Sequence, residues 1–241
     1  MLKINIKKYL IMKKIIIIGA GAMGSAFAVP CLENKNEVTI IGTHLEDDLI
    51  DSIKSNNNFH PALKVELPTK LKVEKYEKLK SILEREVDII VAGVSSIGIE
   101  WFVNQISKNY KKNLPIILLT KGLAIEDNEL ITLSDKIKKL LKKQGHEEVN
   151  VSAIKGPCLA AGLAYKMRTG TVIANPDIKE TEKLKKIIST DYYSTEISDD
   201  LTGVELAGAI KNIYSMLIGA SEGLSNSKAP KEIQSKYYLN T

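Results

Sequence analysis

An apolar run that ends abruptly in spaced glycines dominates the amino-terminal part of this sequence. Four isoleucines, Ile15 to Ile18, precede Gly19, Gly21 and Gly24, which have the spacing G-x-G-x-x-G. Consecutive isoleucines are typical of a parallel strand that is buried on both faces. The first glycine permits a tight turn, the second lets the backbone approach a pyrophosphate, and the third lets a helix touch the strand. The stretch therefore predicts a Rossmann-like, dinucleotide-binding turn.

The residues of this turn are the first candidate site. A helix that begins directly after the turn points free N–H groups and the positive end of its dipole at the pyrophosphate. The cofactor, NAD or NADP, would therefore lie against the backbone of the turn. The candidate cofactor-binding residues here are Gly19, Gly21, Ala22, Met23 and Gly24.

Length and charge limit the class of protein. At 241 residues the chain can bury one good core and part of a second. Its 34 basic and 29 acidic residues leave a net charge of +5, and the lysines are scattered through the expected helices. This distribution favours a solvated surface over a nucleic-acid site.

The amino terminus and the cysteines give further limits. Apolar stretches within residues 1–11 are too short for a signal or a membrane segment. If Met12 is the natural start, residues 1–11 form an N-terminal extension. Cys31 and Cys158 have no metal-binding spacing and suit a reducing, cytoplasmic compartment. Because no His or acid lies near Cys158 in the sequence, a buried thiol is favoured there over a nucleophile.

The remaining chain alternates apolar strands with helical patterns, which predicts an α/β fold with a Rossmann-like, doubly wound sheet. Residues 12–199 would form this NAD(P)-binding domain, and residues 200–241 would begin an all-helical C-terminal domain. A polar segment over Ser52 to Pro61 is interpreted as a loop, and 128–144 as one amphipathic, lysine-rich helix. Further strands are expected at 37–41, 70–73, 88–94, 114–120, 149–154, 170–174 and 192–197.

The choice between NAD and NADP stays open. An acidic residue at the end of the second strand would hold a ribose 2′-hydroxyl in an NAD-specific fold. The sequence has Gly42, Thr43 and His44 there, and no arginine for a 2′-phosphate. Thr43 and His44 are candidate cofactor contacts, although the interpretation of His44 as a plain loop residue is favoured. The acids from Glu46 to Asp48 come late and favour the start of a helix.

Two other strand ends carry candidate residues. Ligands of open α/β sheets collect beyond the carboxyl ends of the strands. Ser95 and Ser96 follow the strand expected at 88–94 and would line the nicotinamide side, or cap a helix, or both. Lys121 follows the strand expected at 114–120 and would face the ligand crevice.

A nearly all-apolar helix begins at Thr202 and carries Lys211 and Asn212 in its middle. An unpaired buried ammonium is costly, so a lysine in apolar surroundings needs a partner or a purpose. A desolvated lysine also titrates readily, which suits proton transfer. Lys211 is therefore the strongest catalytic candidate in the chain.

Taken together, these segments resemble NAD(P)-dependent glycerol-3-phosphate dehydrogenase. The resemblance covers residues 12–229, and its most specific part is the stretch Gly203-Val-Glu-Leu-Ala-Gly-Ala-Ile-Lys-Asn212. It implies an oxidoreductase that interconverts sn-glycerol 3-phosphate and dihydroxyacetone phosphate in glycerophospholipid and carbohydrate metabolism. It also implies Lys211 and Lys121 as catalytic residues, with Lys211 as the general acid and base. The substrate-binding residues that it implies are Lys121, Gly156, Lys211, Asn212 and Asn226.

The carboxyl-terminal residues depart from the family pattern. Relatives continue into a helical domain that brings an Asp near the catalytic lysine and an Arg to the substrate phosphate. Here residues 230–241 lose that pattern, which a truncated or frame-shifted gene product would explain. The apolar helix would then lack its cover and favour self-association, for example as a homodimer.

Two alternatives to an active enzyme of this family stay open. One is an inactive, NAD(P)-binding remnant, which the departure at the carboxyl terminus favours. The other is a related dehydrogenase of the ketopantoate reductase or 6-phosphogluconate type. The stretches Thr120-Lys-Gly-Leu123 and Gly156-Pro157 favour the first family over this second alternative.

Overall fold

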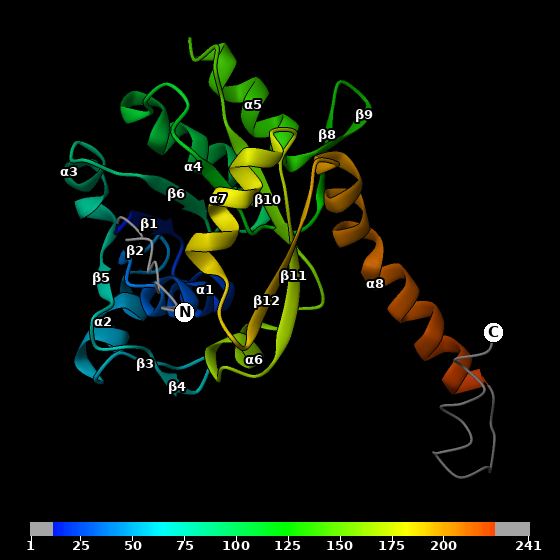
Figure 1. Cartoon of the computed structure of the whole chain (residues 1–241), viewed down its shortest axis with the longest axis horizontal. Helices are drawn as coiled ribbons and strands as arrows, with labels where there is room; N and C mark the ends of the chain where they lie inside the picture. Colours follow the sequence, from blue (N-terminus) through cyan, green and yellow to red (C-terminus); the bar gives the residue numbers. More distant parts are fainter. Residues whose placement is uncertain (1–11, 225–241) are drawn as a thin grey trace, which may run out of the picture.

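The computed structural model describes residues 12–224 and shows a mixed sheet with helices on both faces (Figure 1). The strands are β1 (Lys14–Ile18), β2 (Glu37–Ile41), β3 (Phe59–His60), β4 (Val65–Glu66), β5 (Lys72–Glu74), β6 (Ile89–Ala92), β7 (Ile116–Leu118), β8 (Leu123–Glu126), β9 (Glu129–Thr132), β10 (Val151–Lys155), β11 (Thr169–Ala174) and β12 (Tyr193–Ser198). The α-helices are α1 (Ala22–Glu33), α2 (Asp47–Ser55), α3 (Leu79–Leu83), α4 (Ile99–Ile106), α5 (Leu133–Lys143), α6 (Ala160–Ala164), α7 (Ile178–Ile188) and α8 (Leu201–Leu224). Short 3-10 turns cover Tyr76–Lys78, Ser96–Gly98 and Ser107–Asn109.

The main sheet has the strand order β12-β11-β10-β7-β6-β1-β2-β5. The six strands from β10 to β5 run parallel to one another. Strand β11 runs antiparallel to β10, and β12 runs parallel to β11. The strand order reverses beside β1, which lies between β2 and β6. The predicted doubly wound α/β sheet is confirmed, and its ligand crevice is expected beyond the carboxyl ends of β1 and β6.

The isoleucines of β1 explain why this strand is central. Ile15 and Ile17 belong to the core on one face of the sheet, with Phe27 of α1. Ile16 and Ile18 belong to the core on the other face, with Phe102 of α4. Because side chains alternate along a strand, an unbroken apolar run supplies both cores at once.

Two sequence interpretations were wrong. The helix predicted over 128–144 begins only at Leu133, because Glu129–Thr132 pairs with Leu123–Glu126 as an antiparallel hairpin. The loop predicted over Ser52 to Pro61 contains the last turn of α2 and the two residues of β3. In both places pairing with a neighbouring strand of a short hairpin contributes to the local structure, and periodicity along the chain did not reveal that pairing.

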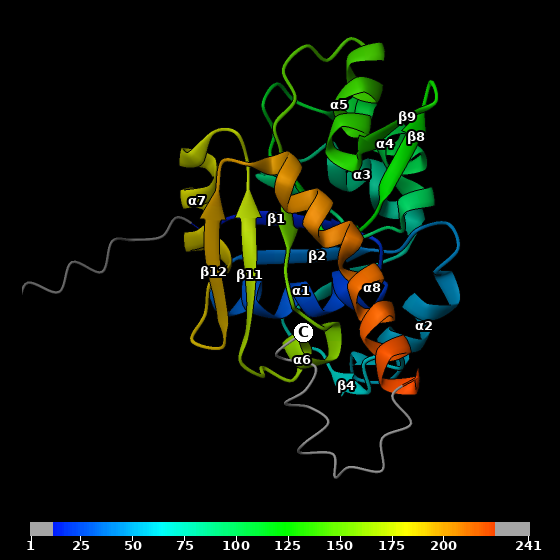
Figure 2. The same ribbon diagram turned by 90° about the vertical axis from the view of Figure 1, so that its right-hand side faces the viewer.

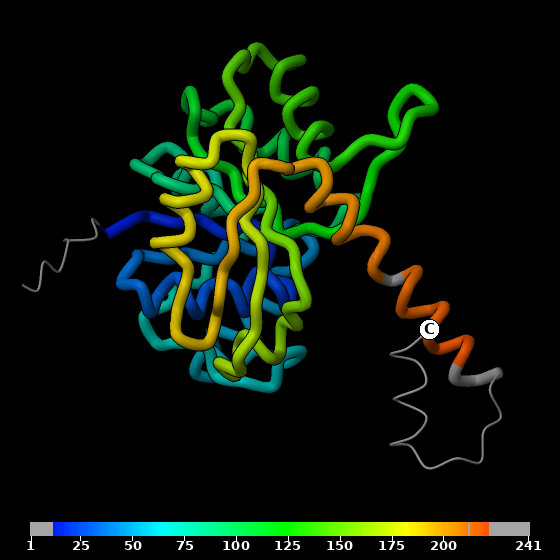
Figure 3. Tube along the Cα trace, turned by 45° about the vertical axis from the view of Figure 1, so that its right-hand side comes forward, coloured from blue at the N-terminus to red at the C-terminus, as the bar shows by residue number. Residues whose placement is uncertain are grey.

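Helix α8 begins on the sheet and then leaves it. Its first turns contact β10, β11 and the β8–β9 hairpin. Beyond them the helix extends away from the sheet and its covering helices (Figures 1 and 3), and in Figure 2 it passes in front of them. Several of its large apolar side chains are exposed, among them Ile213, Tyr214 and Leu217. Within residues 12–224, no helix is both long enough and apolar enough to cross a membrane.

Candidate functional site

The glycine turn after β1 packs directly against the turn after β6. Gly19 has φ +108°, and a side-chain Cβ there would lie 2.6 Å from the Gly93 carbonyl oxygen. A Cβ on Gly24 would lie 2.5 Å from the carbonyl oxygen of Gly19. The turn is therefore shaped by the absence of side chains and leaves backbone N–H groups open at the start of α1. This cradle fits the pyrophosphate of a dinucleotide.

The backbone N–H and carbonyl of Ala20 make three hydrogen bonds to side chains. Its carbonyl accepts hydrogen bonds from Nε2 of buried His60 at 2.9 Å and from Oγ of Ser25 at 2.9 Å. Its N–H donates to the Glu46 carboxylate at 3.0 Å. The sequence analysis missed His60 and assigned Glu46 only to the start of a helix. No motif surrounds His60, so its role depends on the β3–β4 hairpin folding back onto the turn.

The candidate cofactor contacts Thr43 and His44 lie just beyond the end of β2. Thr43 is half-buried, and its N–H donates to the Glu46 carboxylate at 2.7 Å. His44 is exposed, with its ring centroid 5.2 Å from that of Trp101 and 6.3 Å from that of Tyr76. His44 is thus part of an aromatic cluster at the rim of the crevice.

A cavity of about 460 Å³ opens beside the glycine turn, at the carboxyl ends of β6 and β7. Ser95, Ser96 and Lys121 all line it, together with Met23. Ser95 precedes the 3-10 turn Ser96–Gly98, but its side chain makes no capping hydrogen bond. The structure thus brings these predicted residues to one cavity.

A second cavity, of about 340 Å³, lies between the end of β10 and helix α8. Lys121 lines this cavity as well as the first one. Lys155, Lys211 and Gly156 also line it, so three lysine side chains border one small space. Such a space would attract a phosphorylated, anionic substrate.

Lys155 is a buried lysine that the sequence analysis did not single out. Its side chain is 3% exposed, and Nζ donates to the carbonyls of Leu118 at 3.1 Å and Thr120 at 2.7 Å. Burial lowers the pKa of this ammonium to about 8; the Glu205 carboxylate opposes the shift, and Lys121 adds to it. Lys155 therefore ties the end of β7 to β10 and holds the backbone that leads to Lys121.

Helix α8 brings two functional groups to this site. Glu205 is fully buried and accepts the N–H of Ser134, at the start of α5, at 3.3 Å from each carboxylate oxygen. Lys211 lies farther along the helix and is exposed, not surrounded by apolar groups as the sequence suggested. Lys211 is exposed because the other described residues pack against α8 only near the start of that helix. Asn212 lies in α8, but the structure does not describe its side chain. Asn226 lies outside the described residues.

Cys158 is buried beside the first cavity, as expected. Desolvation raises the pKa of its thiol. A raised pKa leaves less thiolate at neutral pH, so the environment favours an inert thiol.

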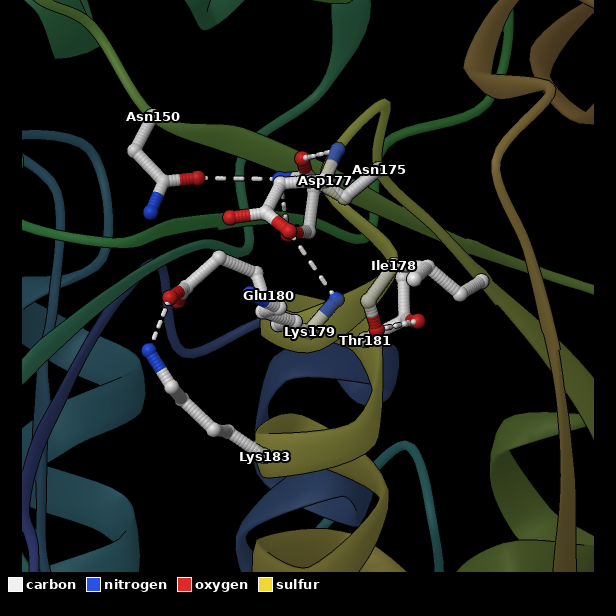
Figure 4. Close-up of polar contacts among 9 residues, drawn as sticks. Asn150, Asn175, Asp177, Ile178, Lys179, Glu180, Thr181 and Lys183 are labelled. Carbon is white, nitrogen blue, oxygen red and sulfur yellow. Dashed lines mark hydrogen bonds and ion pairs between the residues drawn. The ribbon is translucent and has the colours of Figure 1, made fainter.

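A larger cavity, of about 1170 Å³, lies at the opposite edge of the sheet. Figure 4 shows the polar groups beside it, at the start of α7. The Asn175 amide donates to Asn150 Oδ1 at 2.9 Å and to Ser152 Oγ at 2.8 Å, and its oxygen accepts the N–H of Asp177 at 2.8 Å. Asp177 in turn caps α7 by accepting the N–H of Lys179 at 3.0 Å. These groups satisfy one another and hold the start of the helix, which is a structural role.

The site can now be compared with known proteins. Residues 14–181 match the profile described as the NAD-dependent glycerol-3-phosphate dehydrogenase N-terminus. This chain belongs to that family. The match includes the glycine turn and confirms the family resemblance, and it favours this family over the ketopantoate reductase and 6-phosphogluconate types.

Relatives in the glycerol-3-phosphate dehydrogenase family include one from Archaeoglobus fulgidus, described as NADP(+)-dependent. It is 35% identical over 212 residues, which cover 88% of this chain and 61% of that protein. A Mesoplasma florum enzyme described as using NAD(P)+ is 32% identical over 83% of this chain and 58% of its own length. The crystal structure of the Coxiella burnetii enzyme has a TM-score of 0.74 at 25% identity, covering 90% of this chain and 63% of that one. The chain thus spans about three fifths of the length of these relatives.

Proposed function

We propose that this chain binds NAD(H) or NADP(H) at the glycine turn and interconverts sn-glycerol 3-phosphate and dihydroxyacetone phosphate. The observation that carries the proposal is the position of Lys121, which lines both the cavity beside the glycine turn and the cavity bordered by Lys155 and Lys211. A cofactor and an anionic substrate in these two spaces would meet at Lys121. The named relatives are glycerol-3-phosphate dehydrogenases, which supports the choice of substrate.

The lysines account for the proposed chemistry. A bound nicotinamide dinucleotide supplies the hydride in one direction and accepts it in the other. Lys211 protonates the ketone oxygen during reduction and takes the proton from the C2 hydroxyl in reverse. Lys121 adds positive charge where the oxygen becomes negative. Asn212 and Asn226 would help to place the substrate, as the family resemblance implies.

The proposed partners are a small-molecule substrate and a second copy of the chain. The substrate is a phosphorylated triose, and a second copy of the chain would cover the exposed apolar side chains of α8. Cys31 and Cys158 are free thiols, which suits the proposed cytoplasmic location.

The test is to follow NADH and NADPH oxidation by the full chain at saturating dihydroxyacetone phosphate, with cofactor binding measured in parallel. We expect turnover that falls by about a hundredfold or more in Lys211→Ala, because a general acid contributes at least that much. Lys183→Ala, which changes an exposed lysine of α7, is the matched control and should keep full activity.

The same experiment separates the alternatives. Cofactor binding without turnover would identify an inactive, dinucleotide-binding remnant; the exposed position of Lys211 is the observation that favours this second candidate. A folded chain that binds neither cofactor would contradict both.

A further inference from the structure

Glu46 places a carboxylate at the mouth of the glycine turn. It directly precedes α2, yet its side chain makes no capping hydrogen bond to that helix. Instead, Oε2 accepts the N–H of Ala20 at 3.0 Å and the N–H of Thr43 at 2.7 Å. One oxygen therefore bridges the turn after β1 and the turn after β2.

The second oxygen of this carboxylate faces the cofactor side. Oε1 lies 3.9 Å from the position that a Cβ on Gly21 would occupy, so it lies against the second glycine of the motif. Within residues 12–224 it makes no hydrogen bond. It is therefore free to accept hydrogen bonds from a ligand.

The surroundings of Glu46 provide few positive charges that could bind the additional 2′-phosphate of NADP(H). Neither turn, 19–24 or 42–48, contains a lysine or an arginine. The lysines that reach α2 are already paired, Lys75 with Asp51 and Lys54 with Glu74. A ribose 2′-hydroxyl can donate to a carboxylate, whereas a 2′-phosphate carries negative charge and is repelled by it.

We propose that Glu46 sets the choice of cofactor and makes this chain prefer NAD(H) to NADP(H). The proposal rests on the proposed dinucleotide site, in which the adenosine ribose lies beyond the carboxyl end of β2. Glu46 takes the place of the acid that is missing at the end of that strand. The preference would differ from that of the Archaeoglobus fulgidus relative, which is described as NADP(+)-dependent.

The test is to titrate the full chain with NADH and with NADPH, following nucleotide fluorescence, and to compare the two dissociation constants. We expect the dissociation constant of NADH to be lower than that of NADPH by about tenfold or more. In Glu46→Gln the ratio of the two dissociation constants should fall by about tenfold. Glutamine keeps an oxygen that can accept the Ala20 and Thr43 N–H groups but removes the charge. Asp48→Asn removes an exposed charge from the first turn of α2 and should leave the ratio unchanged.

A measurement on the unchanged protein provides an independent check. Added salt screens charge repulsion, so the disadvantage of NADPH should shrink as salt is raised. Equal or tighter binding of NADPH by the unchanged chain would overturn the proposal. A ratio that Glu46→Gln leaves unaltered would also overturn it, whereas failure of the folded chain to bind either nucleotide would refute the dinucleotide site itself.

Discussion

The surroundings of Lys155 disfavour the protonated, charged form of its side chain. Its ammonium is almost fully buried, and the Lys121 charge nearby adds to the cost of protonation. The two carbonyls that it contacts and the Glu205 carboxylate offset part of that cost. A lysine in this balance changes its protonation near neutral pH, whereas an exposed lysine does so near pH 10.

This balance predicts how stability depends on pH. The native lysine loses its proton near pH 8, whereas the unfolded one keeps it up to its ordinary value of 10.5. Between these values the unfolded chain binds more protons, so the free energy of unfolding rises with pH. Relative to Lys155→Met, the unchanged protein should gain about 1.5 kcal/mol between pH 8 and pH 9.5.

Urea unfolding of both proteins across this pH range measures the difference. Lys138→Met, which changes a lysine of α5 outside the buried site, is the control and should follow the unchanged protein. A constant difference between the unchanged protein and Lys155→Met would show that Lys155 does not titrate in this range.

Among the elements, the β8–β9 hairpin and α5 show how a local signal was misinterpreted. Asp127 and Asn128 have φ +53° and +62°, the conformation of a tight hairpin turn that Asp and Asn tolerate. The helical periodicity of the lysine-rich segment obscured this turn signal. The true start of the helix is marked by Thr132, whose Oγ1 accepts the N–H of Asp135 at 3.2 Å.

Thr132→Ala should therefore destabilise the protein by about 1 kcal/mol, because it removes the N-cap acceptor of α5. Equilibrium denaturation measures this change. The control Thr202→Ala alters an exposed threonine in the first turn of α8 and should stay within about 0.5 kcal/mol of the unchanged protein. Equal effects of the two substitutions would show that the cap contributes nothing specific.

At the scale of the whole molecule, the sheet and its two cores form a self-contained unit, and α8 is the element that extends beyond it. The carboxyl-terminal half of this helix exposes Ile213, Tyr214, Met216 and Leu217. Exposed apolar side chains gathered on one element are typical of an interaction surface. This arrangement underlies the proposed homodimer.

The homodimer predicts concentration-dependent association in sedimentation velocity experiments. Leu217→Glu should shift the protein toward the monomer, because it places a charge among these apolar side chains. Ile178→Glu, at an exposed apolar position of α7, should leave the association unchanged. Sedimentation as a monomer at every concentration would contradict the dimer.

The parts of the fold that depend on neighbours in sequence could be predicted from the sequence alone. The bounds of β2 were predicted to the residue, and the glycine turn lies where the spacing of Gly19, Gly21 and Gly24 placed it. Apolar runs and glycine spacing are local patterns, and the burial of a central parallel strand follows from them directly. The family resemblance rested on such patterns as well.

The parts that depend on distant residues were decided only by the tertiary structure. His60 lies 40 residues from Ala20, Glu46 lies 26 residues from it, and Lys155 lies 35 residues from Thr120. A histidine, a glutamate or a lysine gains such a role when the fold brings it to a backbone group far away in sequence, and no periodicity records that contact. The sequence therefore determined where the cofactor turn lies, and the tertiary structure decided which charged groups surround it.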